Sequence, residues 1–295
     1  MLAARILATV RTTTGQAVWK QSYLFPLLAP LQRIKDGKSF STVTTGNITP
    51  EEAKRANWEG RVDLAAAFRG LEMLNFHEGI CNHLSLIVPA ANGDGNVMLM
   101  NPYGHHWSEF MIEPEYCVGL NNQGEVVEGK GEVEISAKTI HLGIHKTRPD
   151  AKCVFHLHPP NATALGMLKD LPFDMYHQNS SLFYNDFAYD RTYGGLSLDV
   201  DEGQRIAKNI GNKLVLFMCN HGVMVVGSSV ANVFHDVYYL ERACMYQVIA
   251  MSTGRELHRI PDEICKMNKE SQDKVKPQLS GPFFDSIKRS IGIKK

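Results

Sequence analysis

The amino-acid sequence predicts an α/β fold in which a mixed, largely antiparallel sheet is covered by helices on both faces. Short apolar runs joined by tight Gly and Asn turns indicate β-hairpins, and other apolar runs alternate with helical segments. The chain has 295 residues, of which 44% are hydrophobic and 21% charged, and it shows no internal repeat. This composition is ordinary for a globular protein, and we expect one domain at residues 46–256.

The first helix has a clear start signal. Thr49 can serve as its N-cap, Pro50 stands at the first helical position and Glu52 can reach back to the cap. This helix should end near Asn75. The later elements are expected in this order: strands at 84–88 and 97–100, a hairpin over 116–127, a helix over 136–148, a strand at 153–157, a short helix over 162–168, a polar aromatic loop over 186–193, a helix over 201–211, strands at 213–219 and 223–226, and a long helix over 229–254.

The two ends of the chain differ from its middle. The first 35 residues contain five Lys or Arg and no Asp or Glu. An amphipathic, acid-poor start is typical of a mitochondrial transit peptide, so residues 1–45 predict import into the mitochondrial matrix. The alternative is an unstructured N-terminal segment on a cytoplasmic protein. Residues 257–295 are polar and Lys-rich without clear periodicity, and we expect a C-terminal tail there.

Charge and hydropathy exclude several classes of partner. Lys plus Arg equal Asp plus Glu at 31 each, and no basic stripe with interleaved aromatic residues is found, so nucleic acid is not an expected partner. No stretch reaches the roughly 18 uninterrupted apolar residues that a membrane span requires. The six Cys include no C-x-x-C pair and mostly lie in apolar runs, which predicts buried, reduced thiols.

Three histidines stand at the ends of two apolar segments. His156 and His158 are two residues apart in the strand that begins at 153, so they project from the same face. His221 follows the strand at 213–219, where the chain turns at Gly222. Three His ligands with one open position form the ligand set of a catalytic zinc site, so we predict Zn²⁺ or another divalent metal here. The alternative is that these are hydrogen-bonded structural histidines.

A second histidine pair lies on the expected helix over 136–148. His141 and His145 are four residues apart, so they lie on one helical face and could imitate a metal site. Ile140 and Ile144 stand beside them on a face that packs against the sheet. Structural hydrogen bonding is therefore the favoured interpretation of this pair.

Six segments occur in a characteristic order: ICNHLS at 80–85, MNPYG at 100–104, EG at 128–129, His141 ahead of RPD at 148–150, HLH at 156–158 and NHG at 220–222. Together they resemble the class II aldolase and adducin head domain family. The resemblance covers roughly residues 57–256 and is closest to the adducin-like branch, in a short form without the adducin neck and tail. It implies a three-layer αβα sandwich, a homo-oligomer that is commonly a tetramer, a small-molecule substrate, and zinc bound by His156, His158 and His221.

The resemblance also marks where this chain departs from the sugar-phosphate aldolases. Their catalytic Glu falls at Ala137 here, and Ala cannot transfer a proton. Of their two phosphate-binding hydroxyl residues only Ser136 remains, and Tyr103 replaces a small hydroxyl residue. A sugar-phosphate substrate is therefore not expected. The residues that we predict to bind substrate are Asn82, Ser85, Tyr103, Gly104 and Ser136.

Two function hypotheses follow. The first is a metal-dependent lyase that cleaves, decarboxylates or dehydrates a small oxygenated carbonyl or carboxylate compound through a metal-stabilised enediolate. Such chemistry needs a proton donor or acceptor, and Glu134, with Glu132 as the second choice, stands just before the vacant Ala137 position. The alternative is a non-catalytic, adducin-like oligomeric module with a partner in the actin cytoskeleton.

Overall fold

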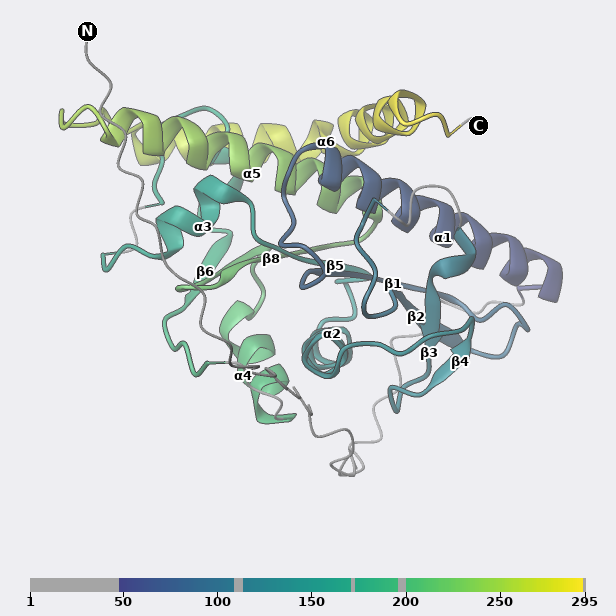
Figure 1. Cartoon of the computed structure of the whole chain (residues 1–295). Coiled ribbons are helices and arrows are strands. Elements are labelled where there is room, and N and C mark those ends of the chain that lie inside the picture. The colour runs from purple at the N-terminus through teal and green to yellow at the C-terminus, as the bar shows by residue number, and fades with distance from the viewer. Residues whose placement is uncertain (1–47, 109–113, 171–172, 196–199, 294–295) are drawn as a thin grey trace, which may run out of the picture. The chain divides into compact units, whose positions relative to one another are not determined.

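The computed structural model describes residues 48–108, 114–170, 173–195 and 200–293 (Figure 1). These residues form one sheet of eight strands: β1 (His83–Pro89), β2 (Asn96–Met100), β3 (Val118–Leu120), β4 (Val126–Glu128), β5 (Cys153–Leu157), β6 (Phe187–Asp190), β7 (Val215–Met218) and β8 (Gly222–Gly227). Their order across the sheet is β4-β3-β2-β1-β5-β8-β7-β6. Every neighbouring pair is antiparallel except β6 and β7, which are parallel. The predicted mixed, largely antiparallel sheet is confirmed.

Helices cover both faces of this sheet, as the αβα prediction requires (Figure 1). Four helices lie on one side of the sheet and two lie on the other side, and buried apolar side chains fill both interfaces. The first group is α1 (Pro50–Met73), α3 (Pro160–Gly166), α5 (Val230–Met251) and α6 (Asp262–Ser290), in which α6 packs on α5 and α1, and the second is α2 (Ile135–Thr147) and α4 (Val200–Ile210).

The start of α1 follows the sequence signal closely. The Glu52 amide donates to the Thr49 hydroxyl at 3.3 Å, and the Glu52 carboxylate accepts from the Thr49 amide at 2.8 Å, so both halves of the capping box are present. The helix ends at Met73, close to the expected end near Asn75, with Leu74 as its C-cap, and Asn75 takes a left-handed conformation with φ of 58°.

The expected C-terminal tail is wrong for residues 262–290, which form α6. Two internal prolines and many charged residues obscure the helical period in the sequence, because only a narrow stripe of α6 is buried. Phe284 lies in the main core with 2% exposure, and the Lys288 ammonium pairs with Asp63 of α1. The helix packs on α5 and α1 of its own chain.

The expected polar aromatic loop over 186–193 contains a strand that sequence patterning missed. Residues 187–190 form β6, which pairs in parallel with β7 at the edge of the sheet. A four-residue edge strand carries too few alternating positions to be recognised from periodicity. This strand places Asp190 beside the turn that carries His221, as described below.

Two smaller predictions concern membranes and thiols. Among the residues that the structure describes, no helix has the length and hydropathy to cross a bilayer. All six cysteines are free thiols, and five of them are buried while Cys81 is exposed. The segment predicted as a transit peptide, residues 1–45, lies outside the described residues.

Candidate metal centre

Three imidazoles meet at one end of the central strands. His156 lies in β5, His158 follows it directly, and His221 lies in the turn between β7 and β8. Because β5 and β8 are antiparallel neighbours, the end of one strand meets the start of the other. One ring nitrogen from each histidine lies within 4.8 Å of the other two. The predicted convergence of the three side chains is confirmed.

The spacing of two of these nitrogens matches that of two ligands on one metal ion. Two nitrogens bound to one tetrahedral zinc at about 2.0–2.1 Å lie roughly 3.3–3.4 Å apart. The Nε2 atoms of His156 and His158 are 3.3 Å apart. The His156 Nδ1–H donates to the Val223 carbonyl at 3.2 Å, which leaves the lone pair on Nε2. A backbone partner on the outer nitrogen is the usual arrangement for a metal-binding histidine.

Burial keeps the three imidazoles neutral. Desolvation, followed by repulsion from neighbouring histidines, lowers the pKa of His156 well below its usual value. Burial likewise lowers the pKa of His221 to about 4 and also lowers the pKa of His158. A metal ion binds only neutral imidazole, so the site holds its ligands in the required protonation state near neutral pH.

The backbone around the cluster explains why small residues stand there. A Cβ atom on Gly222 would lie 2.5 Å from the Leu157 carbonyl oxygen, which is closer than packing allows. Asn220 takes a left-handed conformation with φ of 58° to form the turn before His221. Gly at 222 therefore permits the close approach of β8 to the end of β5.

A buried glutamate holds the chain just after His158. The Glu241 carboxylate of α5 accepts from the backbone amides of Asn161 and Ala162, both at 2.8 Å. These contacts fix the start of α3, two residues after the end of the His-x-His segment. Burial raises the pKa of Glu241, and the amide donors oppose that shift.

A buried chain of hydrogen bonds adjoins the cluster. His83 Nδ1 lies 2.7 Å from His141 Nε2, and the hydroxyl of Ser85 lies 2.5 Å from His141 Nδ1 and 2.7 Å from His145 Nε2. His145 Nδ1 lies 2.7 Å from the Ala151 carbonyl. The structural interpretation of His141 and His145 is therefore confirmed. Ser85, predicted to bind substrate, is instead fully buried inside this chain.

His83 is a site residue that sequence reasoning missed as a candidate. It stands opposite His156 in the register of β1 and β5, and the two rings are 4.8 Å apart. The available signal was its position as the first residue of an apolar strand, where its side chain shares a face with Ser85. That face could not be related to His156 until the pairing of the two strands was known.

Three of the other predicted substrate-binding residues lie in loops. Asn82 is 1% exposed, and its Oδ1 accepts from the Glu78 amide at 2.7 Å. Its buried Nδ2 has no hydrogen-bond partner among the described residues, so a donor is left over next to His83. Tyr103 is exposed, and its amide donates to the Glu132 carbonyl at 2.7 Å. Gly104 takes a positive φ of 90° in open space.

The structure gives Glu134 a different task from the predicted proton transfer. Its carboxylate caps α2, accepting from the Ala137 amide at 2.7 Å and from the Ser136 hydroxyl at 2.5 Å. Glu132 is exposed. Among the described contacts, neither carboxylate touches the three histidines. Ala137 is buried in an apolar cluster between α2 and the sheet.

A different carboxylate approaches the cluster. Glu78 Oε2 lies 3.8 Å from His158 Nδ1, on the side of the ring opposite the shared Nε2. Glu78 stands in the loop between α1 and β1, and no motif around it singled it out. The same loop carries Asn82, whose contact with the Glu78 amide fixes the loop.

A second carboxylate, that of Asp190, lies near His221. It is 3% exposed, pairs with the Arg205 guanidinium and accepts from Asn209 at 3.1 Å. Asp190 opposes the burial effect on His221 by favouring its charged form. Asp190 and Arg205 line a small cavity together with His221.

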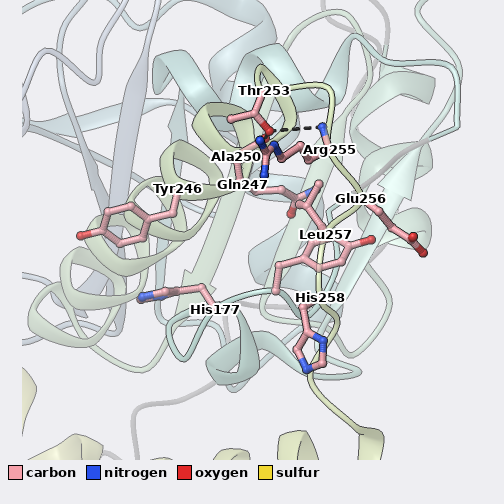
Figure 2. Close-up of a pocket in the computed structure, with 10 residues that line it drawn as sticks. His177, Tyr246, Gln247, Ala250, Thr253, Arg255, Glu256, Leu257 and His258 are labelled. Carbon is pink, nitrogen blue, oxygen red and sulfur yellow. Dashed lines mark hydrogen bonds between the residues drawn. The ribbon is translucent and has the colours of Figure 1, made fainter.

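A separate pocket of about 410 Å³ lies at the C-terminal end of α5 (Figure 2). None of the predicted site residues lines it. Its lining includes His177, whose ring lies 4.6 Å from that of Tyr246, and the exposed His258. The three-histidine cluster is thus distinct from this pocket.

The fold and site define a three-layer αβα protein with a histidine cluster at one end of its central strands. The chain belongs to the family described as the class II aldolase and adducin N-terminal domain, which matches residues 62–248.

The names of the related proteins differ in how much they say: one gives only a class, and another gives a reaction. A Caulobacter vibrioides protein, whose name gives the class aldolase class 2 and no substrate, is 32% identical over 77% of this chain and 84% of its own length. Decarboxylase NovR of Streptomyces niveus is 30% identical over 69% of this chain and 73% of its own length. The crystal structure of an aldolase II superfamily protein from Pseudomonas syringae is 28% identical, with a TM-score of 0.71 over 81% of this chain and 96% of that one.

Proposed function

We propose that this chain is a metal-dependent lyase that acts on a small oxygenated carbonyl or carboxylate compound. The observation that carries the proposal is the set of three neutral imidazoles whose ring nitrogens lie within 4.8 Å of one another. A divalent cation bound there, zinc by our first choice, would supply the positive charge that stabilises an oxyanion developing on the substrate. The likeness to decarboxylase NovR supports a carboxylate-bearing substrate.

The residues around the cluster suit such a substrate. Asn82 Nδ2 is a buried donor with no partner among the described residues, which is available to a ligand oxygen. Glu78 approaches His158, and Asp190 favours the charged form of His221. With Ala at position 137, proton transfer falls to another group, and Glu134 and Glu78 are the two carboxylates that we would test first.

Elemental analysis of the purified full chain tests the proposal. We expect close to one zinc, manganese, iron or cobalt per chain after reconstitution, and little in a His156→Ala, His158→Ala double variant that still folds. His258→Ala, which removes an exposed histidine from the separate pocket, is the matched control (Figure 2). Metal binding would justify a screen of hydroxy-acids, keto-acids and ketose-like compounds. No metal in the parent would overturn the lyase proposal and favour the adducin-like binding module.

We further propose that the protein is a homo-oligomer imported into mitochondria. Exposed apolar side chains on α5 and α6, among them Ile249, Met267 and Leu279, support an interface between copies. The basic, acid-free start of the sequence supports import. Light scattering on the purified protein tests the first claim. A reporter fused to residues 1–45 tests the second, and a reporter that stayed in the cytosol would remove it.

A further inference from the structure

The buried chain of hydrogen bonds beside the cluster has one consistent direction. The Ala151 carbonyl can only accept, so His145 Nδ1, 2.7 Å away, must carry a hydrogen. His145 is buried, which favours the neutral form, so its Nε2 holds a lone pair and accepts from the Ser85 hydroxyl at 2.7 Å. The direction of the chain is therefore set at its far end by a backbone group.

The same reasoning continues toward the cluster. Ser85 has one hydroxyl hydrogen, which it gives to His145, so it accepts from His141 Nδ1 at 2.5 Å. The buried His141 then holds its lone pair on Nε2 and accepts from His83 Nδ1 at 2.7 Å. Each side chain in the series thus donates one hydrogen bond to one neighbour and accepts one from the other.

His83 stands at the near end of this chain. With its hydrogen on Nδ1, its Nε2 carries the lone pair, and that atom has no hydrogen-bond partner among the described residues. The ring lies 4.8 Å from that of His156, at an interplanar angle of 32°. The nearest rings are thus other imidazoles, and no carboxylate among the described residues contacts His83 to favour a charged form.

We propose that the chain from Ala151 through His145, Ser85 and His141 fixes the tautomer of His83, so that His83 Nε2 accepts a hydrogen bond from a substrate hydroxyl beside the metal centre. His83 is then a specificity-determining residue, and the substrate class narrows to compounds with a hydroxyl next to the carbonyl or carboxylate. This inference rests on the proposed function for its ligand, but the tautomer itself does not require a metal.

Two measurements test the two parts separately. The first is ¹⁵N NMR of the metal-free, histidine-labelled full chain, with the His83 signals assigned by their loss in His83→Phe. We expect a protonated Nδ1 and an unprotonated Nε2 on His83. In Ser85→Ala the series of hydrogen bonds is interrupted, so both tautomers of His83 should appear. Ser85→Thr keeps the hydroxyl and should keep the tautomer of the parent protein. Ser180→Ala, another buried serine outside the chain, is the control.

The second measurement compares glycolate with acetate, which differ by one hydroxyl, by calorimetry on the zinc-loaded protein. We expect glycolate to bind about tenfold more tightly in the parent, as one additional hydrogen bond of about 1.4 kcal/mol would give. The preference should fall severalfold in Ser85→Ala and in His83→Phe, with zinc content and acetate affinity retained.

Each outcome separates the claims. If both variants still prefer glycolate to acetate, the preference comes from chelation of the metal by glycolate, and the proposed role of His83 is wrong. If His83 in the parent protein carries its hydrogen on Nε2, the proposed donor-to-acceptor direction of the hydrogen-bond series is wrong. If Ser85→Ala fails to fold, Ser85→Thr and His83→Phe still decide the question. A protein without zinc would remove the proposed function while the NMR result on the tautomer stands.

Discussion

Glu78 Oε2 faces His158 Nδ1 at 3.8 Å, while His158 Nε2 faces His156. A carboxylate on the outer nitrogen of a metal-binding histidine orients the ring and makes it a better ligand. We expect Glu78→Gln to lower metal affinity by about tenfold, at the lower end of the usual effect because Glu78 is largely exposed. Competition with a coloured chelator measures this.

Glu270→Gln, at an exposed position on α6, is the control for Glu78→Gln. An unchanged metal affinity in Glu78→Gln would show that the carboxylate does not support His158. A loss of activity with the metal retained would instead indicate proton transfer by Glu78, which the structure permits because its carboxylate is exposed beside the cluster.

Gly222 determines how closely β8 approaches the end of β5. We expect Gly222→Ala to lower the free energy of unfolding by about 1–3 kcal/mol and to reduce the metal content, because its Cβ would meet the Leu157 carbonyl at 2.5 Å. Gly194→Ala is the matched control, since a Cβ there meets nothing within 4 Å. Urea unfolding and elemental analysis check both effects, and parent-like values for Gly222→Ala would contradict the packing argument.

Much of the site was predictable because its residues stand next to strong local signals. The His-x-His spacing in an apolar strand places His156 and His158 on one face, and a Gly after His221 marks a turn. The capping box of α1 and the helical pair His141 and His145 are likewise local patterns. Each of these predictions depends on residues fewer than five positions apart.

The parts that were missed depend on pairing between distant segments. His83 can be recognised as a site residue only from its register with His156, 73 residues later in the sequence. Glu78 lies in a loop, and the fold of that loop brings it near His158. β6 is too short to show alternation, and α6 buries only a narrow stripe that two prolines interrupt. Such features follow from tertiary packing rather than from local propensity.

His145 makes the metal-free protein sensitive to acid. Burial lowers the pKa of His145 in the folded state from 6.5 to about 4. Above pH 6.5 both states are neutral and the full stability is present. As the pH falls from 6.5 toward 4 the unfolded state gains a proton first, so the free energy of unfolding should fall by up to about 1.4 kcal/mol per pH unit.

We expect His145→Gln to remove this part of the pH slope. Urea unfolding at several pH values between 7.5 and 4.5, with a chelator present, measures the slope in both proteins. The exposed His258→Gln is the control and should keep the parent slope. Equal slopes in parent and His145→Gln would contradict a depressed pKa for His145.

Glu134 offers a test between capping and catalysis. As the N-cap of α2 it accepts from the Ala137 amide, so Glu134→Ala should lower the free energy of unfolding by about 1 kcal/mol. If Glu134 also transfers a proton, activity on an identified substrate should fall by about a hundredfold or more. Glu134→Asn keeps a capping group without a titratable one, so parent-like activity in that variant would end the catalytic role.

Helix α6 belongs to the core of its own domain, which is testable at Phe284. Its ring is 2% exposed and lies 5.3 Å from that of Phe234 in α5. We expect Phe284→Ala to lower the free energy of unfolding by about 3–5 kcal/mol, because it leaves a cavity between α5 and α6. Met267→Ala, on the exposed face of α6, should change it by less than about 0.5 kcal/mol in the monomer. Similar losses in the free energy of unfolding for the two variants would show that α6 does not stabilise the domain. A large loss of stability for Met267→Ala that occurs only at high protein concentration would place an interface between copies on the exposed face of α6.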